Sequence, residues 1–417
     1  MLIWIARGML LALEVALALP LLYLAVLSVA ALIGARHLAT SATSSPAAVD
    51  SPRLALLVPA HDEAEVIAGL LASVAALDYP VARRDVYVIA DNCTDATARI
   101  ARAAGVLGVT VCERRDTAER GKGFALRWQL EALEQAGQRY DGYVFVDADS
   151  QLSANFLRVM ALGLARGADA QQGQYRVQQD ATSWVAGLRA IAFALFNHLR
   201  PLGRQTLGLS SGLKGNGMCF SQAVIERFGW GAYSLAEDAE QHLALVAAGV
   251  RVAYVPAAVV TSAMPTSLRQ AHSQQQRWEH GRLMLARAYA APLVRGALRE
   301  RDLTRLDAIV EVCLPPLSVL AGALALLIAL ALVLGWAPGL AGAALLTALL
   351  ALHGIAGLAL ARLAPRAWLA LVYAPVYVLW KTGVYARAAA RKGGAAWVRT
   401  PRVAAAPGEP AAPAADR

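Results

Sequence analysis

The sequence predicts an α/β domain with a mostly parallel sheet, held between membrane-spanning helices at both ends of the chain. The 417 residues are 57% hydrophobic and only 17% charged, and the mean hydropathy is +0.45. This is too apolar for a soluble protein of ordinary composition. Long apolar stretches stand at both ends of the chain, and short apolar runs alternate with helical patterns between them.

The charge balance indicates anionic partners. The net charge of +9 arises from 39 Lys and Arg against 30 Asp and Glu, which suits an anionic membrane surface, a phosphorylated substrate or nucleic acid. We find no nucleic-acid-binding motif, so membrane lipids and phosphate are the expected partners. The four cysteines lack C-x-x-C spacing, which argues against zinc and disulfides and fits a reducing compartment.

The N-terminal stretch predicts a membrane anchor. Met9 to Ile33 is nearly all Leu, Ala and Val, and a span needs about 20 such residues. The usual small-residue cleavage pattern does not follow it, so a retained anchor fits better than a signal peptide. Residues 40–52 have a linker composition, and we therefore assign residues 1–52 to an anchor and linker.

The next segment has the alternation of a parallel α/β sheet. Predicted strands are Leu54–Val58, Val86–Ala90, Val109–Val111 and Tyr143–Val146, and predicted helices are Glu65–Leu77, Thr94–Ala104 and Phe124–Gln135. In such sheets a ligand binds outside the carboxyl ends of the strands. We expect the acids that follow three of these strands to meet there.

Two carboxylates end the last of these strands, at Asp147 and Asp149. Side chains two residues apart in an extended segment point the same way, so both are expected to face one point. Carboxylates plus substrate phosphates are the usual ligands of Mg²⁺. The alternative is a solvated turn, since Asp and Ser favour turns.

Six motifs in a fixed order resemble the membrane-bound family 2 glycosyltransferases, which include cellulose, hyaluronan and poly-N-acetylglucosamine synthases and ceramide glucosyltransferase. They are VPAHDE (Val58 to Glu63), DNCTD (Asp91 to Asp95), GKG (Gly121 to Gly123), DAD (Asp147 to Asp149), ED (Glu237 and Asp238) and QQQRW (Gln274 to Trp278). The resemblance covers roughly residues 54–402. His61 departs from it, because many members have Tyr or Phe there.

The resemblance implies a GT-A (Rossmann-like) nucleotide-sugar domain and assigns a donor site. Glu63 and Asp91 would accept hydrogen bonds from the uracil and ribose of a UDP-sugar. Lys122 between two glycines would approach the diphosphate, with an ordinary helix-surface lysine as the alternative. Asp149, together with Asp147, would hold Mg²⁺ or Mn²⁺ as a Lewis acid, although Asp147 could instead bind the donor sugar.

The acceptor side follows from the same resemblance. Asp238, next to Glu237, corresponds to the general base, which takes the proton of the acceptor hydroxyl. Gly215 and Asn216 lie in a glycine-rich loop that looks like the segment lining the acceptor pocket. Gln274, Arg277 and Trp278 share one helix face, where Arg277 would bind phosphate and Trp278 would form the floor under the acceptor sugar. A membrane-surface helix is the alternative for this motif.

Three further apolar segments predict a return to the membrane: Ile309–Trp336, Leu340–Ala361 and Trp368–Tyr385. The basic turn at Arg362 and Arg366 places that turn in the cytoplasm with the catalytic domain. A re-entrant or interfacial last segment would keep the following basic residues on that side, with Trp397 and Thr400 to Arg402 near the catalytic domain. The domain boundaries predicted here are 53–265 (catalytic), 266–308 (interfacial helices), 309–387 (membrane segments) and 388–417 (tail).

The sequence therefore predicts an inverting, multi-pass enzyme of the inner membrane that transfers a sugar from a UDP-sugar to an acceptor hydroxyl. Polysaccharide synthesis, with an accessory export subunit as a partner, is the first interpretation. Single transfer to a lipid or lipid-linked acceptor is the alternative. A non-catalytic membrane binding or assembly module is a second alternative, against which the intact motif set argues.

Overall fold

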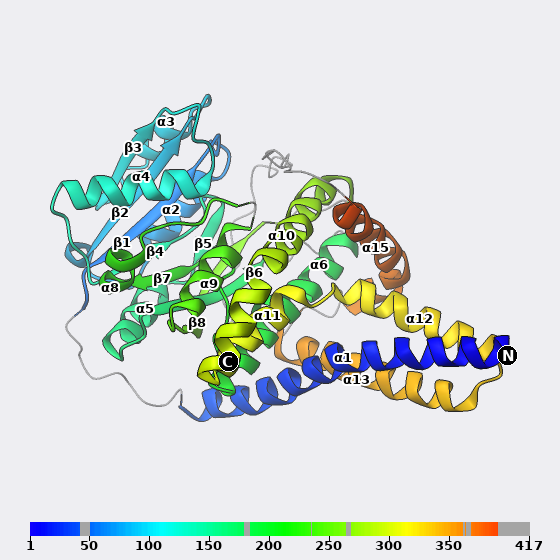
Figure 1. Ribbon diagram of the computed structural model, residues 1–417. Helices are drawn as coiled ribbons and strands as arrows, with labels where there is room; N and C mark the ends of the chain where they lie inside the picture. Colours follow the sequence, from blue (N-terminus) through cyan, green and yellow to red (C-terminus); the bar gives the residue numbers. More distant parts are fainter. Residues whose placement is uncertain are drawn as a thin grey trace.

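The computed structural model describes residues 1–41, 51–178, 184–234, 236–263, 268–361, 363 and 368–390. A sheet domain lies at one end of the molecule, and an elongated group of apolar helices extends from it (Figure 1). Further helices lie between the two parts. The predicted motif Trp397 with Thr400 to Arg402 lies outside the described residues.

Eight strands form one mixed sheet in the order β3-β2-β1-β4-β7-β6-β8-β5. Their bounds are β1 Leu54–Ala60, β2 Arg84–Asp91, β3 Val109–Arg114, β4 Gly142–Phe145, β5 Ser150–Leu152, β6 Ala170–Val177, β7 Met218–Ser221 and β8 Val252–Ser262. The predicted parallel half, β3 to β4, is confirmed. In the other half β7 is antiparallel to both of its neighbours.

The reversal at β7 has a simple cause. The glycine-rich loop arrives at the carboxyl edge of the sheet, so β7 begins where β4 ends, and Phe145 pairs with Met218. The loop therefore lies at the same edge as the acids that follow β1, β2 and β4. The meeting point of β1 and β4 is also where the strand order reverses, which is where open α/β sheets bind ligands.

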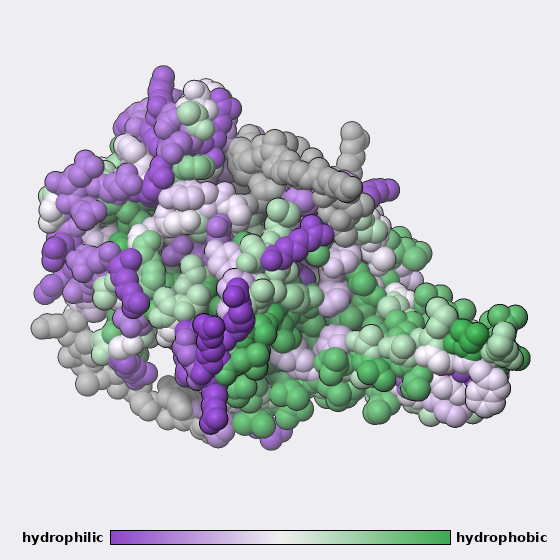
Figure 2. Space-filling model, in the orientation of Figure 1, coloured by the Kyte–Doolittle hydropathy of each residue, from purple (hydrophilic) through white to green (hydrophobic). Residues whose placement is uncertain are grey.

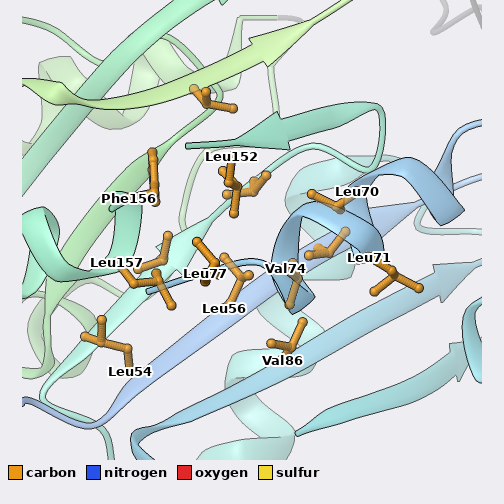
Figure 3. Close-up of a cluster of buried hydrophobic side chains, with 14 of the residues drawn as sticks. Leu54, Leu56, Leu70, Leu71, Val74, Leu77, Val86, Leu152, Phe156 and Leu157 are labelled. Atoms are coloured by element: carbon orange, nitrogen blue, oxygen red, sulfur yellow. The ribbon is translucent and has the colours of Figure 1, made fainter. Parts of the chain in front are cut away.

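Both faces of the sheet are buried, which explains why the strands read as continuous apolar runs. Along β1, Leu54, Leu56 and Val58 face one core, and Ala55 and Leu57 face the other. Figure 3 shows the first core, where β1 packs against side chains of α2 and α5. The helices of the sheet domain are α2 Ile67–Ala75, α3 Thr97–Ala103, α4 Lys122–Gln135, α5 Phe156–Ala165, α8 Gln222–Phe228 and α9 Glu237–Ala247.

Several helices join the sheet domain to the apolar helices. They are α6 Trp184–Ala194, a π-helical turn Leu195–Leu199, α7 Arg200–Thr206, α10 Leu268–Glu300 and α11 Leu303–Cys313. Helix α7 lies directly on α1, because a Cβ at Gly203 would stand only 2.4 Å from the carbonyl oxygen of Leu27. The helices that join the two parts therefore pack against the N-terminal helix α1 through α7.

The apolar helices are α1 Leu2–Ser41, α12 Leu317–Val333 and α13 Ala337–Ala361, which share a core. The face of these helices seen in Figure 2 is mostly hydrophobic, with some polar patches near the far end. Among the described residues, Leu2–His37 and Ala337–Ala361 are each long and apolar enough to cross a membrane. The pair α11 and α12, bent by 71°, adds a third span if it crosses as one unit.

The membrane part differs from the prediction in one place. The expected continuous segment Ile309–Trp336 is broken, because Pro315 and Pro316 cannot donate helical hydrogen bonds. The last segment, Trp368–Tyr385, for which we expected a re-entrant or interfacial path, overlaps a 3₁₀ turn, Ala370–Tyr373, and α15 Ala374–Ala390, and these helices are not among the candidate spans of the described residues.

Candidate functional site

The loops after β1 and β2 are tied together at the carboxyl edge of the sheet. Asp62 adopts a left-handed backbone (φ 54°), and its Oδ1 accepts hydrogen bonds from the N–H groups of Thr94 (2.7 Å) and Asp95 (3.2 Å). The N–H of Glu63 donates to Thr97 Oγ1 at 2.7 Å. These bonds fix Glu63, the predicted nucleoside ligand, beside the end of β2.

Asp62, Cys93 and Asp95 stand close enough to hold a metal ion. The carboxylate oxygens of Asp62 and Asp95, however, already accept hydrogen bonds from backbone N–H groups, including the bond from Ala64 to Asp95 Oδ2 at 3.1 Å. We therefore infer that this group holds the loops after β1 and β2 together, a role that Asp and Asn side chains commonly have in turns.

Asp91 is buried at the end of β2 and is paired with an arginine that the sequence analysis missed. Arg114 Nη1 donates to Asp91 Oδ1 at 2.8 Å, and Asn92 Nδ2 donates to the same oxygen at 3.1 Å. Arg114 also pairs with Asp116 at 2.9 Å. These bonds orient the carboxylate of Asp91, as a ligand for a nucleoside must be.

The DAD segment forms a turn, not the extended segment that we expected. The N–H of Ser150 donates to the carbonyl oxygen of Asp147 at 3.1 Å, which closes a four-residue turn. Asp147 and Asp149 nevertheless remain close enough to repel each other, and this repulsion adds to the effect of burial on Asp149. Burial first and Asp147 second raise the pKa of Asp149 to about 7.

Lys122 lies at the centre of this edge. Its Nζ donates to Asp147 Oδ1 at 2.5 Å and to the carbonyl oxygen of Gly215. Burial alone would lower the pKa of Lys122, but the carboxylates of Asp147 and Glu237 outweigh it and the pKa lies above its ordinary value. The following glycine is needed for packing, since a Cβ at Gly123 would stand 2.4 Å from the carbonyl oxygen of Ala232.

Glu237 and Asp238 open α9 and face the same lysine. Burial is the main reason that the pKa of Glu237 is raised to about 7 and that the pKa of Asp238 is also raised. Lys122 opposes both shifts. The glycine-rich loop touches the second acid, because a Cβ at Gly215 would stand 3.4 Å from Asp238 Oδ2.

Asn216 holds this loop to the sheet. Its Oδ1 accepts from the N–H of Asp147 at 3.1 Å, and its Nδ2 donates to Ser150 Oγ (2.8 Å) and Ser262 Oγ (3.2 Å). The side chain is fully buried. Asn216 therefore positions the loop and the DAD turn, and its neighbour Gly215 presents the carbonyl to Lys122.

The QQQRW motif lies on α10 near α9 (Figure 1). Arg277 is half-buried and interacts electrostatically with Glu237, although burial lowers the pKa of Arg277. Gln274 Oε1 accepts from Arg189 at 2.8 Å. Trp278 lies 6.3 Å from Phe193 between ring centroids.

An aromatic row connects Trp278 with the DAD turn, and sequence reasoning missed most of it. Phe193 lies 5.3 Å from Tyr175 edge to face, and Tyr175 in turn interacts with Asp147 and Asp149. Neither Tyr175 nor Phe193 stands in a motif, so no local signal marked them. Together these rings form an apolar wall beside the carboxylates, as a sugar-binding site requires.

We define the acidic cluster as Asp147, Asp149, Glu237 and Asp238 with Lys122 among them. The structure brings these five predicted residues together, with Glu63 and Asp91 on the neighbouring loops and Arg277 beside Glu237. Four carboxylates around one ammonium leave a surplus of negative charge, which suits a divalent cation.

Comparisons with known proteins give a matching family, a relative and a solved structure of similar fold. Residues 52–281 match the family model "Glycosyltransferase like family 2". The probable glycosyltransferase YdaM of Bacillus subtilis (strain 168) is 26% identical over 236 residues, which are 55% of this chain and 55% of that protein, so the chain spans about half the length of this curated relative. The mannosyltransferase PcManGT from Pyrobaculum calidifontis, solved with GDP-Man and Mn²⁺, is 20% identical and has a TM-score of 0.55 over 90% of this chain and 99% of that chain. The similarity to PcManGT shows that the two chains share a fold.

Proposed function

Because the chain belongs to the glycosyltransferase-like family 2, we propose that it moves a sugar from a nucleotide-sugar to an acceptor hydroxyl at the membrane, with inversion at the anomeric carbon. The observation that carries this proposal is the acidic cluster, where residues from three separate motif segments meet beside the glycine-rich loop at one edge of the sheet. The two candidate spans support membrane association.

The donor side consists of the loops after β1 and β2. Glu63 and Asp91 would bind the nucleoside, and we propose a UDP-sugar as the donor. Both hydrogen bonds from described residues to the Asp91 carboxylate fall on Oδ1, which leaves Oδ2 without such a bond. That oxygen is the one positioned to accept from a base or ribose hydroxyl.

The reaction needs a base for the acceptor hydroxyl. As the acceptor oxygen attacks the anomeric carbon, Asp238 takes its proton, and the bond between that carbon and the nucleoside diphosphate breaks. Burial strengthens Asp238 as a base by raising its pKa. Arg277 and Lys122 supply positive charge beside the leaving diphosphate, and Trp278 forms the floor for the acceptor sugar.

The residues present fit a divalent metal, Mg²⁺ or Mn²⁺. Asp149 and Asp147 offer hard oxygen ligands, and mutual repulsion between them favours a cation. When bound, the metal would act as a Lewis acid that stabilises the charge developing on the leaving diphosphate. In the structure Lys122 occupies Asp147 Oδ1, which points to Asp149 as the stronger ligand.

Two kinds of acceptor are compatible with this site. We rank polysaccharide synthesis first, with an accessory export subunit as a predicted partner. Single transfer to a lipid is supported by the small number of candidate spans among the described residues, which leaves few helices for an export channel. The cytoplasmic position of the catalytic domain and the inner-membrane location stay predictions from the sequence.

The test is a donor panel with purified full-length protein. UDP-glucose, UDP-galactose, UDP-N-acetylglucosamine and GDP-mannose are supplied with and without Mn²⁺, and nucleoside diphosphate release and product mass are measured. We expect metal-dependent release from a UDP-sugar and a loss of about 10²–10⁴-fold in Asp238→Asn. Glu240→Gln on the same helix is the matched control and should stay within about twofold, since its oxygen only accepts from loop N–H groups. No release with any donor would support the non-catalytic module instead.

A further inference from the structure

A second group of buried charges lies where the sheet domain meets the apolar helices, behind the glycine-rich loop. Arg204 of α7 pairs with Asp307 at 2.8 Å and with Glu311, both on α11, and it also bonds Tyr23 of α1. Lys214 of the loop pairs with Glu311 Oε1 at 3.2 Å. We call these residues, together with Arg200 and Arg282, the junction cluster.

Arg200 has no hydrogen bond or ion pair to any described side chain. Only 4% of the residue is exposed, and its contact is the ring of Phe196, 5.5 Å from the guanidinium. Lys214 stands over the same ring at 3.7 Å. Burial lowers the pKa of Arg200 to about 10, which still leaves the group protonated at neutral pH.

Orphaned N–H groups accompany this unpaired charge. The buried Nε of Arg200, Nη1 of Arg204 and Nε of Arg282 have no acceptor among the described residues. Arg204 and Arg282 both act electrostatically on Arg200, so the three guanidinium groups are neighbours. Buried N–H groups are normally satisfied, and three orphans in one place indicate that an acceptor belongs there.

The charges do not balance. Three cations, Arg200, Arg204 and Lys214, surround the two carboxylates, and both carboxylates are already bound by Arg204 or Lys214. A buried cation that lacks a partner is costly, and a phosphate group has the charge and the several acceptor oxygens to satisfy such a set.

From this surplus of cations and orphaned donors, we propose that the junction cluster binds the phosphate group of a membrane lipid. The elements around the cluster favour a membrane lipid as the source of the phosphate, because they include α1 and α13. His353 of α13, near Arg200, bonds Ser28 of α1 at 2.8 Å, and Glu311 of α11 is the main counter-charge. Both α1 and α13 belong to the apolar helices (Figures 1 and 2).

The position of Lys214 links this site to the reaction. Lys214 belongs to the junction cluster, and the next residue, Gly215, contacts Lys122 and Asp238 in the acidic cluster. A phosphorylated lipid bound here would have its head group on the acceptor side of the catalytic base. This link to the acceptor rests on the proposed function, whereas lipid binding itself does not.

The test measures binding without a donor, so that its failure and the failure of sugar transfer are separate results. Full-length protein in a neutral detergent is titrated with dioleoyl phosphatidic acid, with dioleoylglycerol and with inorganic phosphate, followed by microscale thermophoresis. We expect phosphatidic acid to bind at least about tenfold more tightly than the other two, and Arg200→Met to remove this preference. Arg287→Gln, an exposed arginine on α10, is the matched control and should keep it.

Stability separates a ligand site from a structural role. Arg200→Met should keep or raise the melting temperature without lipid, because it removes an unpaired buried charge. Equal binding of phosphatidic acid and dioleoylglycerol, an equal loss of lipid binding in Arg287→Gln, or a fall in melting temperature in Arg200→Met would each overturn the proposal. Inorganic phosphate binding as tightly as the lipid would overturn the membrane source. In a transfer assay, a glycosylated lipid identifies the acceptor, and an unmodified lipid identifies a bound bilayer component.

Discussion

The acidic cluster and the junction cluster are both buried groups of charges, but they are out of balance in opposite directions. Around Lys122 stand four carboxylates, whereas around Asp307 and Glu311 stand three cations. In the first, burial raises the pKa of Asp149 and Glu237; in the second, burial lowers the pKa of Arg200. The sign of each imbalance indicates the missing partner: a cation at the first cluster and an anion at the second.

The largest expected effect is a difference in stability between variants of Arg204, which is ion-paired, and of Arg200, which has no ion pair among the described residues. Arg204→Met should destabilise the protein by about 3–5 kcal/mol, because it leaves the buried charge of Asp307 uncompensated and Glu311 with Lys214 as its remaining ion pair. Arg200→Met should not destabilise it. Thermal unfolding of the two variants in the same detergent checks this contrast, and equal losses would mean that both arginines are structural.

A second prediction divides the two aspartates of the acidic cluster. Asp149→Asn should lower transfer by about 10²–10³-fold and abolish the response to Mn²⁺, since it removes the stronger ligand. Asp147→Asn should keep a metal response while it releases Lys122. Rates are measured across a Mn²⁺ titration. Loss of the metal response only in Asp147→Asn would reverse the assignment.

A third prediction uses pH. Asp149 has a folded pKa of about 7 against an ordinary value of 3.8, so folded protein without metal loses stability as the pH rises from about 4 to 7. Metal must displace the proton, so Mn²⁺ affinity in the presence of UDP should fall about tenfold per pH unit below 7 and level off above it. Electron paramagnetic resonance of free Mn²⁺ measures this. A flat profile in the unsubstituted protein would contradict the prediction.

The smallest effect concerns the loop between the clusters. Gly215→Ala should cost about 1 kcal/mol of stability, because its φ of 76° strains any side chain, and should lower kcat less than tenfold by crowding Asp238. Gly208→Ala is the matched control: its φ is 72° and no atom lies within 4 Å of its Cβ. It should lose similar stability and keep kcat. Equal kcat in both variants would show that Gly215 does not support the base.

Local patterns were enough to predict the first half of the sheet. The apolar runs at β1, β2 and β4 are buried on both faces, and the acids after them meet because parallel strands share a carboxyl edge. The motif order also predicted that Lys122 and Asp238 stand near the DAD segment. The turn at Asp147 stood only as the alternative to an extended segment, because an apolar run does not indicate where its strand ends.

Contacts between distant segments were not predictable from one sequence. Arg114 stands 23 residues after Asp91, and no motif connects them. The junction cluster joins residues about a hundred apart, such as Arg204 and Glu311, through helices whose packing no local period encodes. The break between α11 and α12 had a local signal in Pro315 and Pro316, but the apolar composition on both sides favoured a single span.

The neighbouring positions of Lys214 and Gly215 mean that the two clusters cannot be set independently. Consecutive Cα atoms are about 3.8 Å apart across a rigid peptide plane, so a displacement of the Lys214 backbone also displaces the Cα of Gly215, which bears the next carbonyl. That carbonyl holds Lys122, and Lys122 holds Asp147. The loop therefore connects the junction cluster to the acidic cluster. The more rigid its backbone, the more a change in the position of Lys214 would shift Lys122 and Asp147.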